Sequence, residues 1–125
     1  MALIDANVAL ELILPNRQKV AQVTEILGNI SEPCISTLSA HLIWHFARLE
    51  RIRDAVISDH IAAYQLLSLT AADYAWALRN ERGKDFEDAL QVAVALNSGC
   101  QQFVTLDRQL ARRYAHEKLQ FVIPR

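Results

Sequence analysis

Three aspartates stand where their carboxylates could bind a cation. Asp5 ends the short apolar run 2–4 and precedes a helical segment. Asp107 follows the β-type run 103–105 and opens the next helix, while Asp88 falls in the first turn of a long apolar helix. Open α/β sheets place ligands at such junctions, beyond the carboxyl ends of their strands. Carboxylates gathered there would repel and raise one another's pKa, so a cluster of this kind usually calls for a divalent cation.

Strand-like and helical segments alternate along the chain, which predicts an α/β fold with a parallel sheet covered by helices on both faces. The residues 82–84 interrupt the pattern before the apolar helix, and residues 65–69 fit either the end of a helix or a short strand. Strands are expected at 1–4, 33–36, 101–105 and 119–123, and helices at 8–13, 16–27, 54–64, 86–97 and 108–116, with two more that begin at Ser39 and Thr70.

The expected helix after Ser39 is amphipathic. Its apolar side chains Leu42, Ile43, Phe46 and Leu49 are predicted to face the core. Three arginines of the same region are predicted to face water, although with Lys84 and Arg108 they could instead flank the acids and guide a phosphate backbone; they are Arg48, Arg51 and Arg53.

Length and composition limit the class of protein. A chain of 125 residues with 52% hydrophobic residues is expected to form a single domain, 1–125, with a sizeable core. The formal net charge of −1 excludes strong attraction to nucleic acid through bulk charge, so phosphate contacts need a local patch or a metal. No apolar run is long enough to cross a bilayer, and the two cysteines are expected to be free thiols, which suits the cytoplasm.

Each candidate residue also has a plain structural interpretation. Asp5 and Asp107 could each cap the helix that follows them. Asp85 and Asp88 are three residues apart, so Asp85 is expected to be the N-cap and Asp88 the acid that points into the site. His41 and His45 have the spacing of metal ligands on a helix, but two histidines without a third ligand are a weak signal.

Three segments in this order resemble the PIN domain, a family that includes the VapC-like toxin ribonucleases. They are LIDAN at residues 3–7, DFEDALQ at 85–91 and FVTLD at 103–107, with LTAAD at 69–73 also in its expected place. The resemblance covers nearly the whole chain. It implies a single domain whose parallel sheet of about five strands lies between helices.

The resemblance also implies a function and a site. It implies a hydrolase that cleaves RNA with Mg²⁺ or Mn²⁺ and acts as the toxin of a toxin–antitoxin pair, with an antitoxin protein as partner and a homodimer as its assembly. On the family pattern Asp5, Asp88 and Asp107 are the catalytic and metal-binding acids. Asn7 and Thr105 lie where polar support of the site is expected.

One position departs from the family pattern. PIN domains usually carry a glutamate early in the helix after the second strand, and here that position aligns with Leu42, next to His41. The nearest acid along the helix is Glu50, roughly 12 Å further along its axis. Loss of this acid predicts weak Mg²⁺ binding. It leaves open the alternative of a catalytically weak or inactive PIN-like module that binds RNA or a protein.

A third interpretation is a phosphate-binding domain of the response-regulator type, which also places acids at the edge of a parallel sheet. It fits less well because the sequence has no obvious lysine after a late strand to hold a phosphoryl group.

Overall fold

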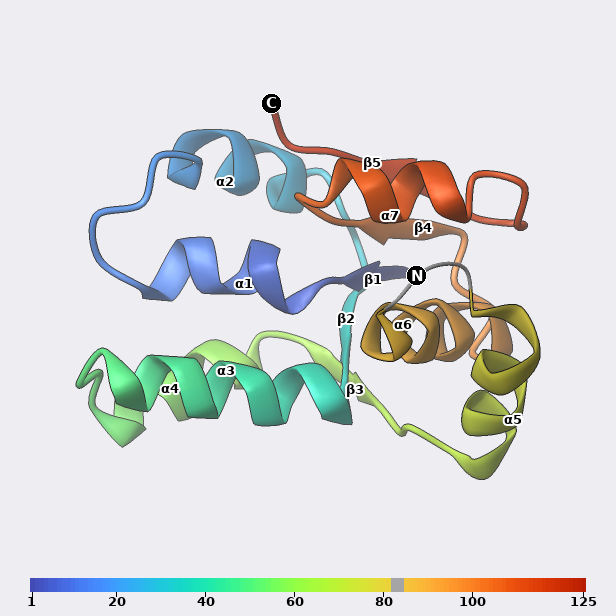
Figure 1. The fold of residues 1–125 in the computed structure, drawn as a ribbon. Helices are drawn as coiled ribbons and strands as arrows, with labels where there is room; N and C mark the ends of the chain where they lie inside the picture. The colour runs from blue at the N-terminus through green and yellow to red at the C-terminus, as the bar shows by residue number, and fades with distance from the viewer. Residues whose placement is uncertain (82–84) are drawn as a thin grey trace.

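The central strand β1 (Ala2–Ile4) has parallel neighbours on both sides, and all three of its side chains are buried. In this computed structural model, which describes residues 1–81 and 85–125, five strands form one parallel sheet in the order β3-β2-β1-β4-β5 (Figure 1). The other strands are β2 (Pro33–Ser36), β3 (Gln65–Leu67), β4 (Gln102–Val104) and β5 (Gln120–Val122). The predicted α/β fold with a parallel sheet of five strands is confirmed.

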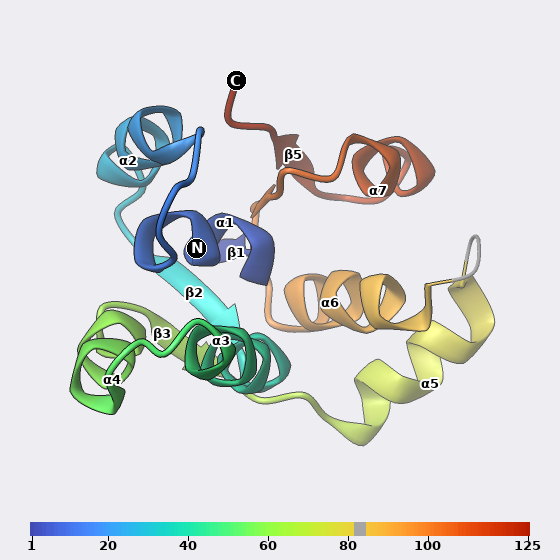
Figure 2. The same ribbon diagram turned by 60° about the vertical axis from the view of Figure 1, so that its left-hand side comes forward.

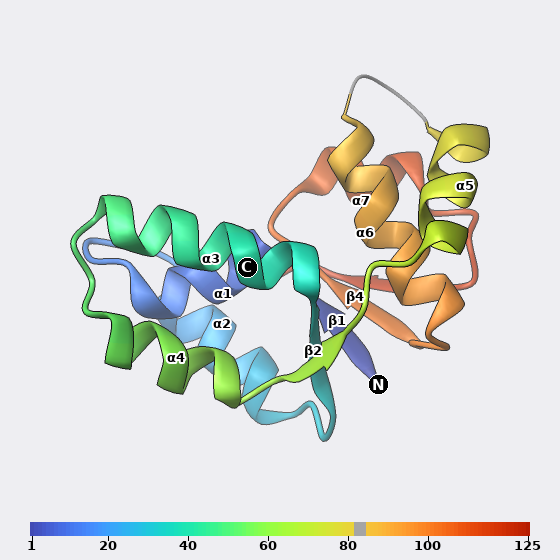
Figure 3. The ribbon, with the colours of Figure 1, turned by 90° about the horizontal axis from the view of Figure 1, so that it is seen from below.

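Helices cover both faces of the sheet, with α1 to α4 gathered on one side and α5 to α7 on the other (Figures 2 and 3). The direction of the crossovers explains this arrangement. From β1 to β3 the chain moves across the sheet in one direction, and from β3 through β4 to β5 it moves in the opposite direction, so right-handed connections place the two sets of helices on opposite faces. The helices are α1 (Ala6–Ile13), α2 (Val20–Gly28), α3 (Thr37–Leu49), α4 (Asp54–Ala62), α5 (Ala71–Asn80), α6 (Phe86–Asn97) and α7 (Arg108–Arg113).

Alternating side chains along the strands divide the core into two clusters. Ile4 and Val104 belong to the cluster with α1 to α4, whereas Leu3 and Phe103 belong to the cluster with α5 to α7. All four side chains are fully buried. Because side chains alternate along a strand, each strand contributes apolar side chains to both faces of the sheet. The same alternation sets the direction in which the side chain of the residue after each strand points.

Helix α2 begins at Val20, four residues later than the start predicted at residue 16. Asn16 adopts a left-handed conformation with φ of 61°, which an α-helix cannot contain, and asparagine tolerates this conformation better than most residues do. The helix ends at Gly28 with Asn29 as its C-cap, one residue later than the end predicted at residue 27.

Helix α3 follows β2 directly, and its N-cap is Ser36 and not the predicted Ser39. The Ser36 hydroxyl accepts a hydrogen bond from the backbone N–H of Ser39 over 2.9 Å. Ser36 therefore ends a strand and caps a helix at once, and the junction needs no loop.

The buried face of α3 also differs from the prediction. Ile43 is buried as expected, but Phe46 is 44% exposed and Leu49 is 67% exposed. The small residues Ser39 and Ala47, one turn on either side of Ile43, occupy the buried face instead. Because small side chains allow α3 to pack closely, the larger apolar residues remain on the surface.

Residues 65–69, which the sequence left open, contain the edge strand β3. The predicted start of α5 is confirmed, since Thr70 and Asp73 form a reciprocal capping box. Asp73 also accepts a 2.6 Å hydrogen bond from Asn97 at the end of α6, which ties the two helices together. The predicted break at 82–84 lies outside the described residues. Within the described part of the chain, no helix has the length and apolar character needed to span a bilayer.

Candidate active site

Asp5 follows the last residue of β1 and is almost entirely buried, with an exposed fraction of 9%. Its backbone N–H donates to the carbonyl of Val104, which places it beside the end of β4. Its carboxylate makes no capping hydrogen bond to α1, so the simple capping role does not apply here. Burial, with a smaller contribution from the charges of Asp107 and Glu87, raises the pKa of Asp5 to about 6, although the hydrogen bond from Thr105 opposes the rise.

Thr105 and Asn7 hold the loop after β4 against the end of β1. The buried Thr105 hydroxyl donates to Oδ2 of Asp5 over 2.8 Å and accepts from the backbone N–H of Asp107 over 3.0 Å. Asn7 accepts from the backbone N–H of Leu106 over 3.2 Å and approaches the Thr105 hydroxyl at 3.5 Å. The contacts of Thr105 with Asp5 and Asn7, and of Leu106 with Asn7, join residues that are about one hundred positions apart in the sequence.

Asp85 caps α6 and thereby sets the direction of Asp88. One oxygen of Asp85 accepts from the backbone N–H groups of Glu87 and Asp88, at 3.0 and 3.3 Å. Burial, together with the charges of Asp85, Asp5 and Asp107, raises the pKa of Asp88 to about 7. The carboxylates therefore share one electrostatic environment, although they come from three separate segments.

Asp107 caps α7, as its plain structural interpretation predicts. Its Oδ1 accepts from the backbone N–H groups of Gln109 and Leu110, at 2.9 and 3.1 Å. Among the described residues Oδ2 has no hydrogen-bond partner, so this second oxygen of Asp107 remains available to a ligand. A capping role and a ligand role are compatible for this residue.

Arg113 is a part of the site that the sequence did not reveal. Its Nη2 donates to Oδ2 of Asp88 over 2.7 Å, and its charge opposes the rise in the pKa of Asp88. The Nε of the same guanidinium is buried and has no partner within the described residues. No sequence spacing signals this pair, because only the packing of α7 beside α6 brings the two residues together.

A buried polar ring was also missed. The Gln91 side chain accepts from the Ser36 hydroxyl and donates to the Ser39 hydroxyl, each over 2.7 Å, and all three residues are buried. Gln91 lies one turn after Asp88, so the ring fastens the first part of α6 to the start of α3. A single glutamine within the apolar sequence of α6 was the signal that could have revealed it.

The donor atoms near the sheet edge suit a hard divalent cation, because they are carboxylate oxygens and only one of them is paired with an arginine. Yet no three His, Cys, Asp or Glu side chains within residues 1–81 and 85–125 converge closely enough to hold a metal ion. One oxygen of Asp88 is also engaged by Arg113. The residues thus fit a cation in chemistry, and binding would require the carboxylates to move together; the metal-binding role of Asp5, Asp88 and Asp107 stays a prediction.

The sequence signature of the PIN domain matches residues 2–116, nearly the whole chain. The chain belongs to the PIN domain family. Comparison with curated protein sequences gave no significant match.

Solved structures support the PIN fold. A toxin–antitoxin complex from Klebsiella pneumoniae contains a chain with a TM-score of 0.80 and 16% identity, and the match covers 100% of this chain and 98% of that chain. VapC20 of Mycobacterium tuberculosis, described as a sarcin-ricin loop cleaving toxin, has a TM-score of 0.74 and 15% identity over 90% of this chain and 94% of its own. VapBC2 of Rickettsia felis, solved with a promoter DNA fragment, has a TM-score of 0.69 and 11% identity over 98% and 97%.

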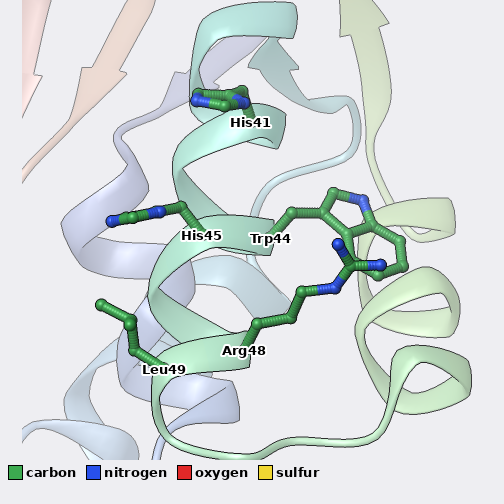
Figure 4. A pocket seen from close by; sticks show the side chains of 5 residues that line it. All are labelled: His41, Trp44, His45, Arg48 and Leu49. Carbon is green, nitrogen blue, oxygen red and sulfur yellow. The ribbon is translucent and has the colours of Figure 1, made fainter.

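Leu42, which aligns with the usual PIN glutamate, is partly buried and packs against the apolar cluster of α1 to α4. Its neighbour His41 is exposed and lines a groove on the outer face of α3 together with His45 (Figure 4). Neither histidine therefore supplies the missing acid. Glu50 is the exposed C-cap of α3 and is equally unsuited.

The arginines near the end of α3 do not flank the acids. Helix α3 starts at the sheet edge and runs away from it (Figure 1), so Arg48 lies roughly 17 Å along the axis from the start. Arg48 pairs with Asp54 at 3.1 Å and lies over the ring of Trp44 (Figure 4). Arg51 and Arg53 are exposed beyond the helix end, and the predicted contribution of Lys84 lies outside the described residues.

Proposed function

We propose that this PIN domain is a divalent-metal-dependent endoribonuclease whose site acids are Asp5, Asp88 and Asp107. The observation that carries the proposal is electrostatic, because Asp85, Asp5 and Asp107 all raise the pKa of Asp88. So much negative charge at one edge of the sheet suits a hard cation and opposes direct binding of an RNA phosphate. Membership of the PIN family supports the same reaction class.

The residues of the chain would hold the acids in position for that reaction. Mg²⁺ or Mn²⁺ bound by the carboxylates would supply an activated water and neutralise charge on the phosphodiester. The Thr105 hydroxyl orients the carboxylate of Asp5, and Asn7 fixes the loop that carries Thr105. Asp85 supports Asp88 by capping the first turn of α6, so we assign Asn7, Thr105 and Asp85 supporting roles.

We further propose that the protein is the toxin of a toxin–antitoxin pair that acts in the cytoplasm as a homodimer. Support comes from the Klebsiella structure, which is a toxin–antitoxin complex, and from VapC20, which is described as a toxin that cleaves the sarcin-ricin loop. In this proposal the partners are an RNA substrate and an antitoxin protein.

The second candidate is a catalytically weak or inactive PIN module that binds RNA or a protein. Leu42 favours it, because an apolar side chain at the position of the usual glutamate removes one negative charge from the site. The ion pair between Arg113 and Asp88 also leaves one carboxylate fewer that is free to bind a cation.

A ribonuclease assay of the purified protein tests the first candidate. We expect RNA cleavage with Mn²⁺, less with Mg²⁺ and none with EDTA. Asp88→Asn and Asp107→Asn should each lower the rate by at least about 100-fold, since a missing ligand typically costs that much or more. Asp59→Asn is the matched control, because Asp59 is exposed on α4, far from the sheet edge.

Cleavage that persists in EDTA, or that Asp88→Asn leaves intact, would contradict the metal-dependent mechanism. If the pure protein binds RNA but does not cleave it with either metal, the second candidate is the better description.

A further inference from the structure

A basic cavity of about 320 Å³ lies beside the candidate active site. Arg108 and Arg112, one turn apart on α7, line one side of it, and Ile123 and Arg125 of the C-terminal segment line another. Ala111 completes the lining. Three arginines from two segments of the chain therefore line one space.

The cavity and the acids lie at the same edge of the sheet. Strands β4 and β5 are parallel and end together; α7 begins just beyond β4, and the C-terminal tail leaves just beyond β5 (Figure 1). Arg108 directly follows Asp107, the cap of α7. On the other side of the same helix Arg113 contacts Asp88. Helix α7 thus separates an acidic site from a basic cavity by the width of one helix.

The guanidinium groups of the cavity are not neutralised by the described part of the chain. Ion pairs among the described residues involve Arg48, Arg113 and His116, and none involves Arg108, Arg112 or Arg125. The Nε of Arg112 donates to the backbone carbonyl of Arg108, which fixes its direction. Since the whole chain has a net charge of −1, this concentration of positive charge is local.

The chemistry of the cavity suits the backbone of a single-stranded nucleic acid. Guanidinium groups bind phosphate oxygens in pairs of parallel hydrogen bonds. Ala111 and Ile123 offer an apolar surface between the charges, which suits a sugar or base. The carboxylates of an acidic peptide could also bind these arginines. Arg108, however, directly follows Asp107, so the cavity favours a ligand that extends from it into the acidic site.

We propose that Arg108, Arg112 and Arg125 form a subsite for the sugar–phosphate backbone of single-stranded RNA, next to the bond that is cleaved. The choice of RNA rests on the proposed function, but binding at this subsite requires neither metal nor cleavage. Binding therefore can be measured separately from activity.

The test is fluorescence anisotropy with a labelled single-stranded RNA of twelve mixed nucleotides, in EDTA and at several salt concentrations. Arg108→Gln, Arg112→Gln and Arg125→Gln should each weaken binding by about 3- to 10-fold, equally for different sequences, as expected of phosphate contacts. Each should also reduce the slope of log affinity against log salt by about 0.7. Arg53→Gln makes the same change of charge at the far end of α3 and should leave affinity within about twofold.

The subsite proposal is overturned if the parent protein does not bind RNA, if the three variants bind like the parent, or if Arg53→Gln weakens binding as much as they do. It is also overturned if a polyglutamate peptide displaces the RNA more effectively than unlabelled polyuridine does, because the cavity then serves an acidic protein segment. Arginine-dependent RNA binding without cleavage in Mn²⁺ would retain the subsite and refute the nuclease. If cleavage depends on Asp88 but the three arginine variants bind RNA like the parent, the nuclease is retained and the subsite is refuted.

Discussion

Arg113 and Asp88 form an ion pair of 2.7 Å between the end of α7 and the first turn of α6. Their side chains are 28% and 16% exposed, so the pair is largely shielded from solvent. The guanidinium therefore meets a carboxylate that a bound cation would also require. Charge at this site is balanced internally in part, and any metal must compete with a residue of the chain itself.

Replacing Arg113 should alter stability and metal response in opposite directions. Arg113→Gln is expected to destabilise the protein in EDTA, on the order of 1 kcal/mol, because Asp88 loses its counter-charge. The same variant should show a larger rise in melting temperature with Mn²⁺ than the parent, because the metal no longer competes with the guanidinium. Differential scanning fluorimetry with and without Mn²⁺ measures both effects. Arg112→Gln, on another side of α7, should behave like the parent, and a smaller Mn²⁺ response for Arg113→Gln would contradict the competition.

Stability in EDTA should depend on pH in an unusual direction near the site. A carboxyl group whose pKa is raised by folding stabilises the fold fully below its unfolded pKa, and that contribution is lost as the pH rises through its folded pKa. For Asp88 this window extends from about pH 4 to about 7. Asp88→Asn should therefore match the parent near pH 4 and exceed its stability by on the order of 2–4 kcal/mol at pH 8.

Urea unfolding at pH 4, 5, 6, 7 and 8 measures this difference. The comparison with the parent is essential, since the pKa of His60 is lowered by burial and gives the opposite trend. His60 favours the fold above its unfolded pKa and loses that contribution as the pH falls through its folded pKa. A difference between parent and variant that does not grow with pH would show that Asp88 is ionised normally.

Much of the fold could be read from the sequence because its signals are local. The apolar run 86–97 and its cap Asp85 define α6, and the β-type runs define the strands that deliver Asp5 and Thr105. Parallel pairing then determines that residues after β1 and β4 meet at one edge. For that reason the acids could be selected before any coordinates were known.

What the sequence could not show depends on packing between distant segments. The buried face of α3 contains the small residues Ser39 and Ala47, which let the helix pack closely, whereas Phe46 stays exposed. A pattern of apolar residues in the sequence cannot predict which of these two faces is buried. The Arg113–Asp88 pair requires α7 to lie beside α6. The late start of α2 depends on the conformation of Asn16, which has no distinctive neighbours.

A glutamate at position 42 should strengthen metal binding if that position is the vacant one of the PIN pattern. Leu42→Glu is expected to increase the Mn²⁺-dependent rise in melting temperature and any ribonuclease activity. In EDTA it should cost about 1–3 kcal/mol, because a charge enters a partly buried position that packs against apolar side chains. Leu42→Gln is the matched control without charge. Equal metal responses for the two variants would mean that Leu42 is not the position of the missing acid.

Exposed apolar side chains on α3 and α5 should contribute to a homodimer. Leu49 at the end of α3 is 67% exposed and Leu78 on α5 is 60% exposed, and an interface between two copies on either helix would bury such a side chain. Sedimentation at tens of micromolar should therefore show a dimer, and Leu49→Glu or Leu78→Glu should shift it towards monomer. Val20→Glu on α2 serves as the control. A parent protein that is monomeric throughout this range would refute the dimer.

The hydrogen bond from Thr105 to Asp5 spans one hundred positions of sequence. Contacts this remote form late, because a long loop must close before they can be made. Strand β1 precedes its partner β4, and the loop that orients Asp5, by about one hundred residues along the chain. A chain that has been synthesised only as far as α6 therefore has no assembled site, and whatever chemistry the acids perform requires β4 and Thr105 to have been made.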